Sequence, residues 1–325
     1  MVAGQLAKDS IKNSTKKQKM NSVTIGIDLG GTRIKAVAIN DEGKILHEIY
    51  QSTNDDGDDK GWKNAVFEVV TKIQLQLGVK KVTIGLSAPG LPNQDNTAIA
   101  FMPGRMQGIE NFIWKDFLNN PTFVLNDAIA AMVAESKFGA AKNIKNAILL
   151  TLGTGVGGAI LIDGKPYQGS GRKAGHIGHM VINDEGEINA TGMPGSLEDC
   201  IGNKSIFIRS KGVYNSTHEL INAYRVGNDF AAAIWHKSVR QLAIGLASLS
   251  NILSPEIIII GGGIAEAGDD LFKPLSEFMN QYEWCPFGNK MKIVKAAYTD
   301  MAGAVGAACF ARDITEKLEN KFEFK

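Results

Sequence analysis

The chain has 325 residues, of which 44% are hydrophobic and 21% are charged, a composition that fits a globular protein and excludes a disordered, collagen-like or coiled-coil chain. At about 150 residues per domain, this length predicts two domains. Its 35 Lys and Arg residues nearly balance 34 Asp and Glu residues, so the net charge of +1 gives no global field that would attract nucleic acid or an anionic membrane.

The termini and cysteines indicate the cellular setting. Three widely spaced cysteines argue against a disulfide framework and favour a reducing environment, so we expect a cytoplasmic protein. Residues 1–22 carry five lysines against one Asp without apolar periodicity, which predicts a disordered tail, with weak nucleic-acid contact as the alternative. An uncharged run over residues 147–162 is too short to span a bilayer. We therefore expect neither a membrane nor a nucleic-acid partner.

Ordered structure is predicted from Val23 onward. A strand, a Gly-rich turn and a second strand occupy residues 23–39, and a third strand follows at residues 44–50. Apolar residues at helical spacing predict a helix over residues 61–78, which leads into a short buried strand. The Pro-, Gly- and Asn-rich segment 89–120 predicts a long functional loop that ends in a short helix over residues 114–118.

A second round of the same pattern starts at Ala147. Residues 148–162 can be laid over residues 25–39, which places Thr151 opposite Asp28 and Gly153 opposite Gly30, so the chain is internally duplicated. A long apolar helix then stops at Pro255 and is followed by an apolar strand. The last predicted helix covers residues 303–318 and carries small residues on its first turns for close packing.

Three glycine-rich turns each follow an apolar strand, as a phosphate-binding cleft between two sheets requires. Glycine lets backbone N–H groups approach phosphate oxygens closely. Each turn alone could equally be a structural hairpin, and none has the Walker or Rossmann glycine spacing. The candidate nucleotide-binding residues in these turns are Gly30, Gly31, Thr32, Gly153, Thr154, Gly155, Gly157, Gly261, Gly262 and Gly263.

Two carboxylates follow buried strands. Asp28 could hold a magnesium ion that bridges nucleotide phosphates, with Lys35 supplying positive charge, or it could satisfy amides of its turn. Asp127 opens a predicted helix, so it is either an N-cap or a general base that accepts the proton of a sugar hydroxyl. Either carboxylate can therefore be structural or chemical.

These segments, in this order and spacing, resemble the ROK (repressor, open reading frame, kinase) sugar kinases of the actin-like ATPase superfamily. Residues 28–35 and 152–158 resemble the two phosphate motifs, and residues 261–264 resemble the adenosine motif. Residues 126–128 resemble the catalytic segment, and residues 174–179 with 195–198 resemble the family signature. The likeness covers residues 23 to about 312.

The resemblance implies an α/β protein with two RNase H-like (actin/hexokinase-type) domains around a central nucleotide and sugar cleft. The first domain is expected over residues 23–126 plus 303–325, and the second over residues 127–302. ATP and Mg²⁺ are the implied cofactors, Asp127 the base, and a homodimer the implied assembly. Residues 87–90 resemble the family's sugar-side loop, and the implied sugar-binding residues are Pro89, Gly90, Asn126, His176, His179 and Glu198.

The sequence departs from the family pattern in two ways. Three cysteines that usually bind zinc with the second signature histidine are replaced by Asn189, Thr191 and Ser196, so we expect no structural zinc. His176 stands where most members have a glutamate that reaches the sugar, as in some bacterial N-acetylmannosamine kinases. An imidazole can donate a hydrogen bond, so this change either alters the recognised sugar or is drift with the same substrate.

The leading hypothesis is therefore an ATP-dependent kinase of the glucokinase type that phosphorylates a hexose at its 6-hydroxyl. An N-acetylmannosamine or other N-acylhexosamine kinase is the alternative. A sugar-sensing repressor and a non-catalytic sugar binder are remote alternatives. The 22 residues before Val23 are too few for a winged helix-turn-helix, and the chain retains Asp127 and all three glycine turns.

Overall fold

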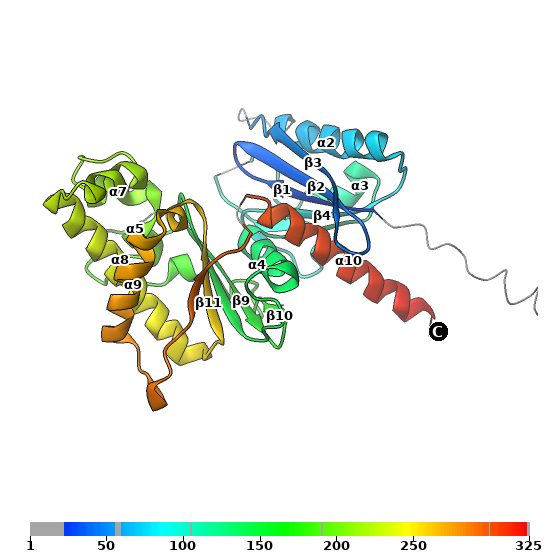
Figure 1. Ribbon diagram of the computed structural model, residues 1–325. Helices are drawn as coiled ribbons and strands as arrows, with labels where there is room; N and C mark the ends of the chain where they lie inside the picture. Colours follow the sequence, from blue (N-terminus) through cyan, green and yellow to red (C-terminus); the bar gives the residue numbers. More distant parts are fainter. Residues whose placement is uncertain (1–22, 56–59, 105, 190, 299, 324–325) are drawn as a thin grey trace, which may run out of the picture.

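The protein is built on two five-stranded sheets with the same strand layout (Figure 1). The computed structural model describes residues 23–55, 60–104, 106–189, 191–298 and 300–323. The first sheet has the order β3-β2-β1-β4-β7, and its strands are β1 (Thr24–Leu29), β2 (Arg33–Ile39), β3 (Ile45–Ser52), β4 (Thr83–Ala88) and β7 (Thr122–Asn126). The second has the order β10-β9-β8-β11-β12, and its strands are β8 (Ala147–Leu152), β9 (Val156–Ile162), β10 (Lys165–Tyr167), β11 (Ile257–Gly261) and β12 (Ile293–Lys295).

Strand directions also repeat between the two sheets. In each sheet the first three strands in chain order pair antiparallel with one another, and the last two run parallel to the central strand. Asp28 is the fifth residue of β1 and Thr151 the fifth of β8, as the overlay of the two halves predicts. The structure thus confirms the internal duplication.

The first sheet is covered on one face by α2 (Gly61–Leu77), whose buried side chains include Trp62, Val66 and Ile73. This helix ends at Gly78, which takes the left-handed conformation (φ 66°) that favours glycine. The long segment between β4 and β7 contains the short strands β5 (Leu91–Pro92) and β6 (Ile99–Phe101) and the helix α3 (Trp114–Leu118). The predicted bounds of α3 are confirmed.

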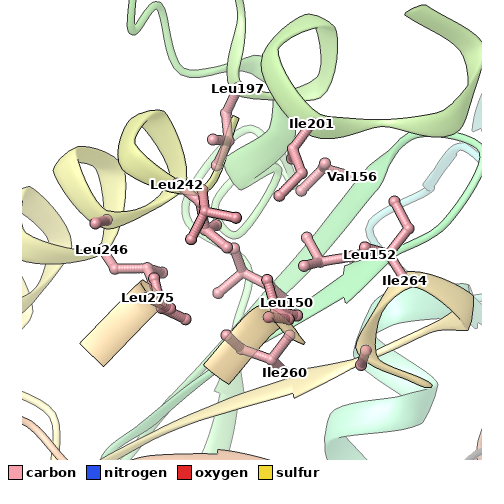
Figure 2. Packing of buried hydrophobic residues seen from close by; sticks show 14 of the residues in the cluster. Leu150, Leu152, Val156, Leu197, Ile201, Leu242, Leu246, Ile260, Ile264 and Leu275 are labelled. Atoms are coloured by element: carbon pink, nitrogen blue, oxygen red, sulfur yellow. The ribbon is translucent and has the colours of Figure 1, made fainter. Parts of the chain in front are cut away.

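The second sheet packs against a layer of helices. The apolar core between them extends to the β8–β9 turn, to the segment with Glu198 and to the segment with Gly263. Figure 2 shows Leu152 and Val156, which flank the β8–β9 turn, together with Leu197 and Ile264. Since Leu197 precedes Glu198 and Ile264 follows Gly263, one apolar cluster fixes these segments together. The helices of this layer are α5 (Leu197–Ile201), α6 (Ile206–Arg209), α7 (Thr217–Arg225), α8 (Asp229–Leu253) and α9 (Asp269–Tyr282).

Two helices, α4 (Asp127–Phe138) and α10 (Ala302–Glu323), lie between the sheets (Figure 1). Glycines allow this packing: a Cβ on Gly26 or Gly85 would clash with the backbone of α10, and one on Gly306 would clash with the Ala130 carbonyl. The domain bounds at residues 126 and 303 stay a prediction, and the expected tail over residues 1–22 lies outside the described residues. None of the helices in the described ranges has the length and apolarity to cross a bilayer.

Candidate active site

A cavity of about 500 Å³ brings together two of the three glycine turns. Its wall includes Gly153 and Thr154 from the β8–β9 turn and Gly263 from the segment after β11. The remaining lining comes mainly from the helical layer and includes Asn203, Thr217, His218, Arg225 and Glu266. These two turns thus lie where one nucleotide could contact both, whereas residues 30–32 and the expected sugar-binding residues lie outside this lining.

The β8–β9 turn is held by the segment that contains Glu198. The Val156 amide donates to Glu198 Oε2 over 3.0 Å, and Gly155 makes this approach possible because any Cβ there would clash with the carboxylate. The amides of Asn203 and Lys204 donate to the carbonyls of Gly153 (2.9 Å) and Thr154 (2.8 Å). A residue expected to bind sugar therefore also fixes the backbone expected to bind phosphate.

Gly262 has a special role in the third turn. Its φ of +85° is in the left-handed region, and a Cβ at this position would clash with the Leu152 carbonyl. The glycine therefore lets the third turn pass directly over the end of β8, which joins it to the second turn.

Thr53 holds the first turn, residues 30–32, by two hydrogen bonds. The buried Thr53 hydroxyl donates to the Gly30 carbonyl over 2.6 Å, and the Thr53 amide donates to the Thr32 carbonyl over 3.1 Å. Gly31 and Thr32 are exposed, and no atom lies within 4 Å of where a Gly31 Cβ would be. The turn thus presents free backbone to the solvent.

Asp28 lies at the carboxyl end of β1 with a defined hydrogen-bond partner. The Ser87 hydroxyl donates to Asp28 Oδ1 over 3.0 Å, while Lys35 Nζ is 4.0 Å from Oδ2. Burial raises the pKa of Asp28 from its ordinary value, and the Lys35 charge and the Ser87 hydrogen bond oppose that shift. No turn amide among the described residues donates to Asp28, so the turn-capping role considered for it is wrong.

Asn126, and not Asp127, caps α4. Asn126 Oδ1 accepts from the amides of Ala128 (3.0 Å) and Ile129 (3.4 Å), and its backbone is extended as an N-cap requires. Asp127 is already helical, and its Oδ1 accepts from the Ala128 amide over 2.8 Å. The interpretation of Asp127 as the N-cap is therefore wrong, because the cap falls one residue earlier.

Asp127 is exposed to solvent at the start of α4. Loss of hydration raises its pKa to about 6, and the negative charge of Asp28 adds to the shift. Asp127 is still in contact with solvent, so its raised pKa reflects partial loss of hydration by nearby protein atoms. A carboxylate with a pKa near 6 suits a general base at neutral pH.

The Asn126 side chain also fixes the expected sugar-side loop. Its Nδ2 donates to the Gly90 carbonyl over 3.0 Å, and the side chain is 4% exposed. Gly90 has a φ of +97°, and a Cβ on it would lie 2.6 Å from the Phe101 carbonyl oxygen. The structure thus places Asn126, Gly90 and the neighbouring Pro89 together at the carboxyl ends of β4 and β7.

His176 and His179 form a parallel pair. Their ring centroids are 6.2 Å apart with an interplanar angle of 8°, and the short helix η1 (Ile177–His179) sets their spacing. His176 is half-buried and His179 is exposed. Burial lowers the pKa of His176, and the nearby His179 lowers it further, which favours a neutral imidazole that can both donate and accept.

A hydrogen-bond network occupies the three places where family members usually carry zinc-binding cysteines. Asn189 Nδ2 donates to Asp199 Oδ2 (2.8 Å) and to Ser196 Oγ (3.1 Å), and Ser196 Oγ donates to the same carboxylate oxygen (2.6 Å). The Thr191 hydroxyl donates to Asn189 Oδ1 over 2.6 Å. Burial raises the pKa of the adjacent Cys200 thiol to about 11, so at neutral pH it is not a thiolate.

Several site residues were not found by the sequence reasoning. Ser87 was placed on the sugar-side loop, whereas its hydroxyl contacts Asp28. Asp300 received no role, yet it binds the ammonium of Lys35. Thr217 and Arg225 line the cavity that contains the two glycine turns. No local sequence pattern marks these contacts, because the residues reach the site from distant parts of the chain.

The chain is similar to known sugar kinases. The chain is 30% identical over 311 residues to a glucokinase of Thermotoga maritima, covering 89% of this chain and 97% of that protein. It is 33% identical over 248 residues to an N-acetylmannosamine kinase of Vibrio cholerae, covering 75% and 85%. The solved ROK family glucokinase of Streptomyces griseus in complex with glucose and AMPPNP superposes with a TM-score of 0.75 at 27% identity, covering 90% of this chain and 100% of that one. Since the profile described as the ROK family also matches residues 24–314, this chain belongs to the ROK family.

Proposed function

We propose that the protein is an ATP-dependent kinase that transfers the γ-phosphoryl group of ATP to the 6-hydroxyl of a hexose, as a glucokinase does. The observation that carries this proposal is the exposed Asp127 carboxylate, which lies near Asp28 and has a pKa of about 6. The similarity to glucokinases along almost their whole length supports the same conclusion.

The cavity of about 500 Å³ suits the nucleoside, and the turns at residues 30–32 and 153–155 suit the phosphates. Asp28 fits a magnesium site, because Mg²⁺ is usually held by one or two carboxylates together with substrate phosphates. No hydrogen bond to its Oδ2 is found among the described residues, and Lys35 Nζ lies 4.0 Å away from it. Bound magnesium would neutralise charge on the phosphates.

In the reaction, Asp127 accepts the proton of the 6-hydroxyl while that oxygen forms a bond to the γ-phosphorus and the bond to the ADP oxygen breaks. Asn126 holds the start of α4 and the Gly90 loop, so it fixes the direction in which the Asp127 side chain leaves the helix. Positioning of this kind supplies much of the rate enhancement in phosphoryl transfer.

His176, His179 and Glu198, with the loop at Pro89 and Gly90, are proposed to bind the other sugar hydroxyls. Glu198 links them to the phosphate turn through the Val156 amide, so sugar binding and phosphate binding share one support. We also propose that the protein forms a homodimer in the cytoplasm.

An N-acylhexosamine kinase is the second candidate, and His176 is the observation that favours it. A neutral imidazole can donate to an acetamide carbonyl, which an ionised glutamate cannot. The 33% identity to an N-acetylmannosamine kinase is in agreement.

A coupled ADP-release assay across glucose, mannose, fructose, allose, N-acetylglucosamine and N-acetylmannosamine tests both candidates. We expect ADP release that depends on the sugar and is largest with glucose. A largest kcat/KM with N-acetylmannosamine would favour the second candidate, whereas ADP release independent of any sugar would contradict both.

A further inference from the structure

Three side chains form a row across the first sheet at the expected magnesium site. Asp28 on β1 is the cross-strand partner of Lys35 on β2, and Lys35 is the partner of Tyr50 on β3. Directly paired residues on adjacent strands point to the same face. The row therefore places an ammonium group between the Asp28 carboxylate and the Tyr50 hydroxyl.

The ammonium of Lys35 makes its close ion pair with Asp300 and not with Asp28, although Asp28 is its cross-strand partner. Lys35 Nζ is 2.9 Å from Oδ1 of Asp300 and also donates to the Asp300 carbonyl over 2.9 Å, whereas Asp28 Oδ2 is 4.0 Å away. Tyr50 donates its hydroxyl hydrogen bond to the same Asp300 carboxylate. Asp300 thus binds both Lys35 and Tyr50, the two members of the row other than Asp28.

The position of the Lys35 ammonium affects whether Asp28 can bind a magnesium ion. A lysine paired closely with Asp28 would occupy a carboxylate oxygen that magnesium needs and would repel the ion. From these contacts we infer that Asp300 is a positioning residue that holds the Lys35 ammonium away from Asp28 and so keeps Asp28 available to the magnesium of the nucleotide. This inference rests on the proposed role of Asp28 in nucleotide binding.

The surroundings of Asp300 support this role. The hydrogen bond from Lys35 is the main cause that lowers the pKa of Asp300, and the hydrogen bond from Tyr50 lowers it further. Asp300 therefore keeps its negative charge at neutral pH. Asp300 also lies just before α10, whose Gly303 packs against the Asp28 carboxyl group, where a Cβ would clash. The segment that returns to the first domain therefore bounds the magnesium site on two sides.

The test is a double-mutant cycle with Asp300→Asn and Lys35→Met, read out by binding and not by turnover. Isothermal titration gives the dissociation constant of AMPPNP with Mg²⁺ and with EDTA, and the ratio of the two measures the contribution of the metal. We expect Asp300→Asn to reduce this ratio about threefold to tenfold, the size of one charge interaction at a partly buried site. In the Lys35→Met background the same change should alter the ratio by less than about twofold.

Asp269→Asn is the matched control, because Asp269 forms an exposed ion pair with Lys273 on α9. It should leave the ratio unchanged. An unchanged ratio in Asp300→Asn, or an equal reduction with and without Lys35, would overturn the inference while leaving the proposed kinase intact. If the unsubstituted protein gained no affinity from Mg²⁺, the proposed role of Asp28 would fail as well. Asp300 is half exposed, so we expect each variant to keep the fold, and thermal unfolding of each variant checks this.

Discussion

At the start of α4, Asn126 and Asp127 lie next to each other but have different surroundings. The Asn126 side chain is buried and bound to three backbone groups, whereas Asp127 is exposed and its Oδ1 accepts from the Ala128 amide. A capping role and a chemical role therefore fall on different residues, and substitution can separate them.

Asp127→Asn should lower kcat by about 10²- to 10⁴-fold, the usual contribution of a general base. Because Asn126 provides the cap, the helix should not be weakened. Loss of hydration makes the ionised Asp127 carboxylate unfavourable in the folded protein, so removing its charge should leave Tm at pH 7.5 unchanged or raise it. Turnover and thermal unfolding measured on the same preparation check this. Normal turnover in the variant would show that Asp127 is not the base.

The pH dependence follows from the same residue. The pKa of Asp127 is raised to about 6, and a base must be deprotonated, so kcat/KM should fall about tenfold per pH unit below pH 6. Stability has the opposite dependence on pH: the folded protein holds the proton more tightly than the unfolded chain, so Asp127 makes stability fall as pH rises from about 4 to about 6. A kcat/KM profile from pH 4.5 to 8 that is flat below pH 6 would contradict this assignment.

His176→Glu tests the choice of sugar. Leaving a buried polar group without a partner discriminates strongly between sugars, so the ratio of kcat/KM for glucose over N-acetylmannosamine should rise by about 10-fold or more. A ratio that stays within about twofold in His176→Glu would mean that this position does not select the sugar.

At the scale of elements, periodicity in the sequence predicted most of the fold. The bounds of α3 agree to the residue, and α2 and α8 lie where their apolar stripes indicated. The start of α4 was less certain, because Asn and Asp are equally good caps and only backbone geometry distinguishes them. Sequence patterns therefore give the type of an element more reliably than the role of its terminal residues.

The hydrogen-bond network of Asn189, Thr191, Ser196 and Asp199 is predicted to hold its shape without zinc. Structural zinc sites use four ligands, mostly thiolates, whereas here an amide, two hydroxyls and the Asp199 carboxylate are joined by hydrogen bonds. Elemental analysis after dialysis against a chelator should find far less than one zinc per chain, and Tm should not change on metal removal. About one zinc per chain that resists dialysis would show that other ligands bind it.

For the whole molecule, the internal repeat predicted two similar sheets, and α4 and α10 join them into one apolar cluster (Figure 1). The surroundings of Asp28 could not be predicted in this way. Ser87 is 59 residues from Asp28, and Asp300 is 265 residues from the Lys35 it binds. Such contacts depend on how the last helix returns to the first sheet, which no local pattern contains.

Identification of the phosphorylated product tests the central claim most directly. The protein, ATP, Mg²⁺ and glucose are incubated, and the product is examined by ³¹P and ¹H NMR, with 6-deoxyglucose as the matched acceptor that lacks only the 6-hydroxyl. We predict a phosphate ester coupled to the two protons on C6 of glucose, none with 6-deoxyglucose, and at least a 100-fold lower yield with Asp127→Asn in the linear phase of the reaction. A phosphate ester at another carbon, or ATP hydrolysis without any sugar phosphate, would contradict the account.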